Sequence, residues 1–230
     1  MSENNFHLPQ EEGHFNAAPS LNPPPTPATK EYKLNHLALR IQDPARSLNF
    51  YVNILGMRVI FTMNAGPFTI YYLGHPPASA KTEEDITAWA KSTSEIPVMT
   101  RTSGLLELYH VHGTENASAD GASVSISTGN VPPHLGFAHL GFTVPDVSAA
   151  VQRLRDAGVS ILKDVGVCSR ETVPLSEWEE ERGIGCGEIH GNYAWFFEKF
   201  AMVADPVSFY SLLAQGVVLM RVDRTATWLS

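Results

Sequence analysis

Hydrophobic and polar residues alternate in two short stretches that each begin with a histidine. The first reads His-Leu-Ala-Leu-Arg-Ile-Gln-Asp from His36, and the second reads His-Leu-Gly-Phe-Thr-Val-Pro-Asp from His139. Alternation of this kind predicts a strand with one buried face. In both copies an aspartate stands seven positions after the histidine, and a helix-like stretch follows that ends at Gly56 or Gly158. The chain therefore contains a duplicated strand–helix unit.

After its helix, the first unit continues with three strand-like stretches, at residues 57–63, 68–73 and 104–110. Asp43 is suited to cap the helix, and Pro44 to occupy its first position. A short inserted helix is expected at 82–91, with Thr82 as its cap. The first unit thus has the order strand, helix and three strands.

The pattern restarts further along the chain, with Asp146 as the expected helix cap. The strands expected in this second unit are 137–144, 159–163, 200–204 and 208–213. A charged and aromatic segment at 165–199 interrupts the unit, and we interpret it as a lid, because long loops in compact domains are usually functional. The predicted organisation is a disordered or wrapping tail at 1–31, a module at 32–111, a linker at 112–135, a module at 136–214 and a C-terminal tail at 215–230.

Composition and charge exclude several classes of function. A net charge of −8 and a pI near 5.5 argue against nucleic acid as a partner. No apolar run approaches the roughly 20 residues that a membrane span needs. The two cysteines, Cys168 and Cys186, are too few for a disulfide framework, which favours a reducing, cytoplasmic location.

Three residues form a candidate metal site. His36 and His139 occupy the same position in the two copies of the repeat, and Glu107 lies in an otherwise apolar strand. A carboxylate on a buried strand is costly unless it is paired or bound to a metal. Two histidines and one carboxylate suit zinc, iron, nickel, cobalt or manganese. We therefore predict one divalent metal ion shared between the modules.

Several motifs resemble those of the vicinal oxygen chelate superfamily, and most of all those of glyoxalase I (lactoylglutathione lyase) of the fungal type. They are His36-Leu-Ala-Leu-Arg-Ile-Gln-Asp-Pro44, Ser47-Leu-Asn-Phe-Tyr51, Leu55-Gly-Met57, Leu106-Glu-Leu-Tyr-His110, Gly113-Thr-Glu-Asn116, Gly136-Phe-Ala-His139 and Val144-Pro-Asp-Val147. The resemblance implies an α+β fold in which two βαβββ modules form a cupped mixed sheet around one divalent metal.

In that family four ligands hold the metal, of which His36, Glu107 and His139 match three. The resemblance places the fourth, a glutamate that also acts as the base, seven residues after Asp205, where Leu212 stands. Zinc is the metal that the resemblance favours, with nickel, cobalt, manganese or iron as alternatives. The three-ligand set also matches that of non-haem iron oxygenases.

The resemblance further implies that Arg40 and Lys163 bind the carboxylates of glutathione, and that Phe68, Tyr71 and Tyr72 line an apolar pocket. Two family positions for glutathione contacts are altered, since Val111 replaces an asparagine and Leu135 an arginine; His110 and His134 could partly substitute. Replacement bases in the long insertion are Glu198, Glu188 and His190, with His112 as a weaker candidate.

The predicted function is a metal-dependent lyase or isomerase that works through an enediolate of a metal-chelated small molecule, such as a glutathione hemithioacetal. The departure at Leu212 leaves two alternatives open: a protein of this fold with a binding role and no lyase activity, and a non-haem-iron oxygenase of secondary metabolism. Because two-module members of the family build sites between chains, the resemblance also implies a homodimer.

Overall fold

The computed structural model describes residues 12–13, 26–115, 126–127, 129–172, 175–205 and 216–220. The strands in this part are β1 (His36–Ile41), β2 (Arg58–Asn64), β3 (Phe68–Gly74), β4 (Leu105–Val111), β5 (Asn130–Val131), β6 (His134–Leu135), β7 (His139–Thr143), β8 (Ile161–Lys163), β9 (Phe200–Ala204) and β10 (Gly216–Met220). The α-helices are α1 (Pro44–Leu48), α2 (Glu83–Thr93), α3 (Ile96–Met99), α4 (Val147–Asp156), α5 (Glu177–Glu180) and α6 (Ala194–Phe197). Short 3₁₀ or π-helical segments are η2 (Pro27–Thr29), η3 (Asn49–Ile54), η4 (Arg170–Thr172) and η5 (Gly191–Tyr193).

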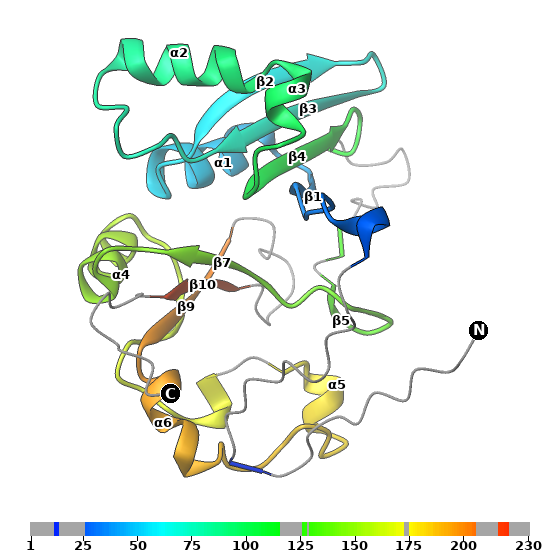
Figure 1. The fold of residues 1–230 in the computed structure, drawn as a ribbon. Coiled ribbons are helices and arrows are strands. Elements are labelled where there is room, and N and C mark those ends of the chain that lie inside the picture. The colour runs from blue at the N-terminus through cyan, green and yellow to red at the C-terminus, as the bar shows by residue number, and fades with distance from the viewer. Residues whose placement is uncertain are drawn as a thin grey trace.

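Two four-stranded sheets are stacked one above the other in the described part of the chain (Figure 1). The first has the strand order β1-β4-β3-β2 and the second β7-β10-β9-β8. In each, the first and last strands of the module pair in parallel, and the other pairs are antiparallel. The predicted α+β fold with a repeated βαβββ unit is confirmed, and both histidine-headed strands are edge strands.

The helix caps expected from the sequence are present. The side chain of Asp43 accepts a hydrogen bond from the N–H of Arg46, and that of Asp146 accepts one from Ala149. The hydroxyl of Thr82 accepts a hydrogen bond from the N–H of Asp85. In turn, the carboxylate of Asp85 accepts one from the N–H of Thr82. These bonds satisfy N–H groups that a helix start leaves without partners.

One core joins the two modules. The inner face of the first sheet, which includes Leu73, Leu106 and Leu108, packs on the helix of its own module and on Leu154 and Val203 of the second. Figure 1 shows α1 on the side of the first sheet that faces the second module, and α2 on the opposite side. The two sheets therefore turn their inner faces toward each other.

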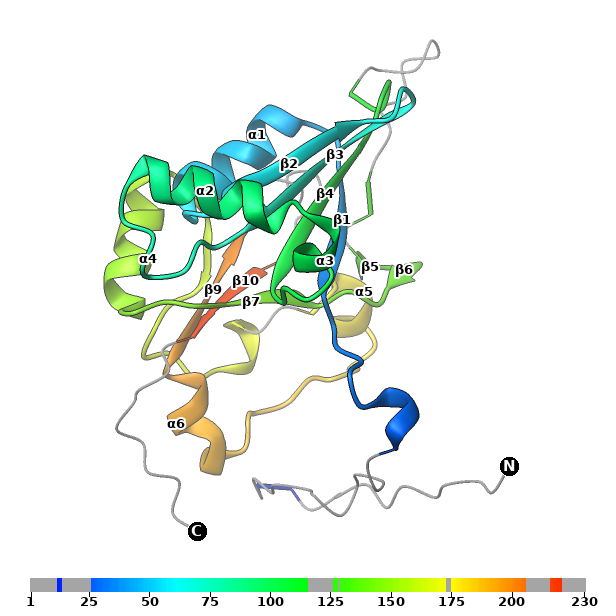
Figure 2. The same cartoon turned by 45° about the horizontal axis from the view of Figure 1, so that its top comes forward.

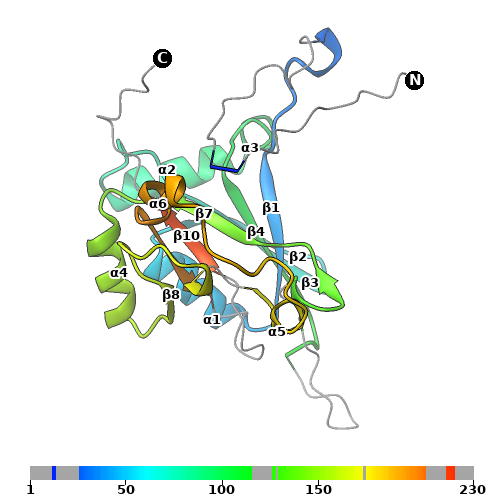
Figure 3. The same ribbon diagram turned by 90° about the horizontal axis from the view of Figure 1, so that it is seen from below.

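The outer faces are covered only in part. On the first sheet, Trp89 of α2 and Met99 of α3 pack against Ile60, Tyr72 and Leu105 (Figure 2). On the second sheet, two phenylalanines of α6 pack against Phe200 and Met202 of β9, and Figure 3 shows the segment with α5 and α6 on this outer side. The described parts of the segment 165–199, expected as a lid, thus lie over the outer face of the second sheet.

Several boundaries differ from those expected. β10 lies at Gly216–Met220, inside the stretch predicted as a C-terminal tail, whereas the predicted strand 208–213 lies outside the described residues. The predicted linker contains the two-stranded ladder of β5 and β6, and η2 begins at Pro27 within the predicted tail. Most of that tail lies outside the described residues. In the part described, none of the helices has the length and apolar character needed to cross a membrane.

A buried hydrogen bond links the modules. The hydroxyl of Tyr51, in η3, donates to the carboxylate Oδ2 of Asp205, just after β9, at 2.7 Å. Both side chains are buried. Burial, and then the negative charge of Asp205, raise the pKa of Tyr51 well above its usual value of 10.0. The folded protein therefore retains this proton at pH values where the unfolded chain loses it.

We expect Tyr51→Phe to lower the free energy of unfolding by about 1–3 kcal/mol at pH 7, because a buried carboxylate loses a donor. The native tyrosine contributes stability below pH 10 that disappears as the pH rises from 10 through the folded-state pKa. Urea unfolding at pH 7, 9 and 10.5 measures both effects. Tyr32→Phe, at a side chain 80% exposed, is the control. An unchanged loss of stability above pH 10 in Tyr51→Phe would contradict this role.

Candidate metal centre

His36 and Glu107 lie side by side on the outer face of the first sheet. Ala38 pairs with Glu107 in the parallel register of β1 and β4, which puts Glu107 on the same face as His36 and Arg40. The Nε2 atom of His36 is 3.7 Å from Oε2 of Glu107. The imidazole is 38% exposed and the carboxylate 17%. The structure thus brings together two of the three predicted ligands.

The chemistry of this pair fits a divalent metal ion. The Nδ1 atom of His36 lies 2.8 Å from the amide oxygen of Asn35, which can only accept, so Nδ1 carries the proton and Nε2 of the neutral ring has a free lone pair. Such a lone pair and the facing carboxylate can both bind a cation that lies between them. Two ligands about 2.1 Å from a tetrahedral metal are about 3.4 Å apart, close to the observed separation.

Tyr72 borders the pair. It stands opposite Glu107 in the register of β3 and β4, and its ring centroid is 5.3 Å from that of His36. Burial, and then the charge of Glu107, raise the pKa of Tyr72 to about 12. The expected pocket residue Tyr71 pairs instead with Leu108 and packs on the inner core. Alternation along β3 sends neighbouring side chains to opposite faces, so Tyr71 lies away from His36 and Glu107 of the same chain, and its role in substrate binding stays a prediction.

Arg40 extends the same outer face away from His36. Its guanidinium lies 5.9 Å from the ring centroid of Tyr109, and the ring of Tyr109 is 4.8 Å from that of Phe68. Arg40 stands four positions after His36, which is about 13 Å along a strand. The predicted substrate residues Arg40 and Phe68 therefore form one continuous face with the candidate ligands.

The third predicted ligand, His139, is not part of this cluster. It begins β7, where Leu140 and Phe142 pack into the shared core while His139 and Gly141 are exposed. His139 thus faces outward from the second sheet, as His36 does from the first. In the described part of one chain, no three His, Cys, Asp or Glu side chains are grouped to hold a metal.

Lys163 has a different environment from the one expected. Its side chain is buried, and its amino group donates to the carbonyl oxygens of Phe197 at 2.6 Å, Phe200 at 2.7 Å and Asp164 at 3.2 Å. Burial lowers the pKa of Lys163. These bonds tie the end of the insertion to β8. Binding of a substrate carboxylate by Lys163 stays a prediction, and it would require them to open.

The predicted bases of the insertion lie apart from His36 and Glu107 of the same chain. His190, the residue before η5, accepts a hydrogen bond from the N–H of Asn192, and the amide of Asn192 donates to the carbonyl of Gly13. Glu198 ends α6, which packs beside β9, and Figures 1 and 3 place α6 away from β1. Their roles as bases stay predictions.

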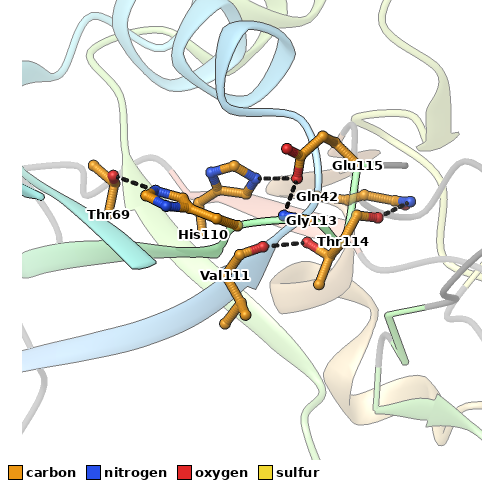
Figure 4. A network of polar contacts seen from close by, with 8 residues as sticks. Gln42, Thr69, His110, Val111, Gly113, Thr114 and Glu115 are labelled. Carbon is orange, nitrogen blue, oxygen red and sulfur yellow. Dashed lines mark hydrogen bonds and ion pairs between the residues drawn. The ribbon is translucent and has the colours of Figure 1, made fainter. Parts of the chain in front are cut away.

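A polar network holds the ends of β1, β3 and β4 (Figure 4). Nε2 of His110 is 3.1 Å from the Glu115 carboxylate, which also accepts from the N–H of Gly113. His112 contacts Thr69, and Gln42 donates to the carbonyl of Thr114. Hydrogen bonds from its own backbone and from His110 hold the pKa of Glu115 below its usual range. His110 is buried in this network, and its role as a substitute contact for glutathione stays a prediction.

The register of the second sheet changes the assignment of the fourth ligand position. Val218 of β10 pairs with Gly141, two residues after His139, just as Glu107 pairs with Ala38, two residues after His36. Counting along the chain led instead to Leu212, which lies outside the described residues. Both assignments place an aliphatic residue where the first module has its glutamate.

Comparison with known families agrees with this geometry. Residues 33–167 match the family model of the Glyoxalase/Bleomycin resistance protein/Dioxygenase superfamily. The chain belongs to this superfamily. The matched region runs from just before β1 to just after β8, so it contains all three predicted ligands.

Within the superfamily, the chain is glyoxalase I-like. It is 34% identical to a lactoylglutathione lyase of Pseudomonas putida over 153 residues, which is 65% of this chain and 80% of that protein. It is 33% identical to glyoxalase I of Saccharomyces cerevisiae over 132 residues, which is 56% of this chain and 36% of the yeast protein. A glyoxalase I structure from Leishmania major covers 83% of this chain and 86% of its own, with 18% identity and a TM-score of 0.44.

Proposed function

We propose that this protein is a metal-dependent glyoxalase-I-like lyase that acts as a homodimer, with His36 and Glu107 of one copy and His139 of the other at each site. The supporting observation is that both candidate faces point outward from a single chain while their strands, β1 and β7, are edge strands. A second copy could bring the two faces together without unfolding the core. The similarity to lactoylglutathione lyases supports a glutathione hemithioacetal as the substrate.

Within this proposal, His36, Glu107 and His139 hold one divalent ion, with zinc as the first candidate and nickel, cobalt, manganese or iron as the others. The bound ion would act as a Lewis acid that stabilises negative charge on the substrate oxygens. Three protein ligands leave open positions for two neighbouring oxygens of a substrate. The stacked rings of Tyr72 and Phe61, whose centroids are 4.8 Å apart, would shield the metal position from water on the outer face.

Glu107 is the carboxylate that this proposal assigns to proton transfer. The fourth-ligand position holds an aliphatic residue by either assignment, and Glu198 lies at the β8–β9 side of its sheet, about 10 Å from β7 across two strand spacings. The Glu107 carboxylate is 17% exposed and lies on the face that Arg40 shares. It would take the proton from one substrate carbon and return it to the next.

Arg40 and Phe68 would bind the glutathione portion. A guanidinium forms two parallel hydrogen bonds with a carboxylate. The guanidinium of Arg40 also lies over the ring of Tyr109. The separation of about 13 Å between His36 and Arg40 suits an extended tripeptide, which spans about 10 Å, rather than a small free aldehyde. A cytoplasmic location belongs to the same proposal and is supported by the free thiols of Cys168 and Cys186.

We expect purified protein to contain about one divalent metal per chain and to form lactoylglutathione from methylglyoxal and glutathione. The measurement combines metal analysis, removal of metal with a chelator, readdition of Zn²⁺, Ni²⁺, Co²⁺, Mn²⁺ or Fe²⁺, and the absorbance of the thioester. Activity should disappear with the metal and return with at least one ion. Absence of turnover with every ion would overturn the lyase proposal. Oxygen uptake that requires Fe²⁺ would instead support the oxygenase, because two histidines and one carboxylate also suit that chemistry.

A further inference from the structure

Asn35 lies directly before β1 and contacts three parts of the first module. Its amide nitrogen donates to the carbonyl oxygen of Met99 at 2.7 Å and to that of Thr102. Its amide oxygen lies 2.8 Å from Nδ1 of His36. The hydroxyl of Tyr72 donates to the same oxygen at 3.4 Å. Every donor and acceptor of this amide therefore has a partner in the described structure.

The two carbonyl partners settle which way the amide faces. A carbonyl oxygen accepts hydrogen bonds and cannot donate them, so the NH₂ group of Asn35 must point to Met99 and Thr102. The oxygen is then left facing His36. Because that oxygen can only accept, Nδ1 of His36 must be the protonated nitrogen of the neutral ring.

We propose that Asn35 is a positioning residue that sets the tautomer and the orientation of His36, and so presents the lone pair of Nε2 to the metal. This inference rests on the proposed function, in which His36 is a ligand. Its basis is the chain of contacts from Met99 and Thr102 through Asn35 to His36. Hydrogen bonds to the second nitrogen of a histidine ligand commonly serve this purpose.

The chain of contacts also gives a role to the segment between β3 and β4. Met99 is the last residue of α3, and it packs with Trp89 of α2 against the outer face of the first sheet. Packing of α2 and α3 therefore determines where the carbonyls of Met99 and Thr102 lie, and through Asn35 determines the angle of the His36 ring. The inserted helices thus support the proposed metal ligand His36 through Asn35.

The test compares full-length wild type, Asn35→Ala and Asn35→Asp, with Asn53→Ala as the matched control. Asn53 is an exposed asparagine in η3 whose amide contacts Asn49. Long-range ¹H–¹⁵N spectra of the imidazole rings, recorded without metal, report the tautomer of His36, which is assigned by its absence in His36→Ala. Zn²⁺ affinity is then measured by competition with a chelator.

In wild type and Asn53→Ala we expect the Nδ1–H tautomer. In Asn35→Ala we expect a mixture of tautomers and a Zn²⁺ dissociation constant about 10- to 100-fold higher. Asn35→Asp keeps an acceptor beside Nδ1 and should retain the tautomer. An Nε2–H tautomer in the metal-free wild type, or an Asn35→Ala variant with wild-type tautomer and affinity, would overturn the inference. Absence of Zn²⁺ binding by wild type would overturn the proposed function, whereas the tautomer measurement would still decide the role of Asn35.

Discussion

Replacing Glu107 with alanine is expected to raise the dissociation constant for Zn²⁺ at least about 100-fold and to lower kcat/KM about 1,000-fold or more. The carboxylate is proposed both to ligate the metal and to move the substrate proton, and loss of a general base alone costs about 10²- to 10⁴-fold. Chelator competition and the thioester assay measure the two effects separately. Residual activity near that of wild type would assign the proton transfer to another group.

The same variant should not lose stability without metal. The side chain of Glu107 is 17% exposed and lies 3.7 Å from Nε2 of His36, where a metal ion or a proton on that nitrogen would offset the burial of its charge. We therefore expect a melting temperature for metal-free Glu107→Ala equal to or above that of wild type, and a much smaller increase on addition of Zn²⁺. Glu84→Ala, at an exposed glutamate in the first turn of α2, is the control. A large drop in the melting temperature of metal-free Glu107→Ala would indicate a structural role for this carboxylate.

Complementation between chains is the second large effect that we expect. His36→Ala and His139→Ala should each be inactive as homodimers. In a heterodimer of the two variants, the intact His36 of one chain meets the intact His139 of the other, so one of the two sites is complete. Co-expression with two different affinity tags, followed by sequential purification, should give heterodimers with about half of the wild-type activity per dimer.

A cis double variant provides the matched control. A heterodimer of wild type with His36→Ala/His139→Ala has no complete site if sites are shared, but it has one if each chain forms its own site. The two arrangements therefore predict opposite patterns of activity. Activity in the cis pair and none in the trans pair would contradict the proposed sharing of sites between copies.

Much of the fold could be predicted from local patterns. The alternation that begins at His36 and His139, the caps Asp43 and Asp146, and the glycines that end the helices are consequences of backbone geometry over a few residues. The grouping of His36 with Glu107 was also predicted, from a repeated histidine and a carboxylate in an apolar strand, and parallel β1 and β4 place the two side chains on one face. Most of these features depend on hydrophobic alternation and capping residues within a few positions of each other in the sequence.

Other features depend on contacts between distant segments. Tyr71 and Tyr72 lie on opposite faces of β3. Only the pairing of β3 with β4, which places Tyr72 opposite Glu107, shows which of the two borders the candidate site. The strand that completes the second sheet was expected before residue 214 and lies at Gly216–Met220, since its position depends on pairing with β7 and β9. No pattern around Asn35 indicated its contact with Met99, because the two residues are 64 positions apart.

The sequence by itself determined the repeated βαβββ unit, the histidine that begins each first strand and the carboxylate in the last strand of the first module, because alternation and capping act within a few residues. Only the tertiary structure decided that His36 and His139 face away from each other in one chain, since the shared core turns the inner faces of both sheets inward and leaves the ligand-bearing faces outside. That opposition is the physical reason for proposing a second copy at the metal.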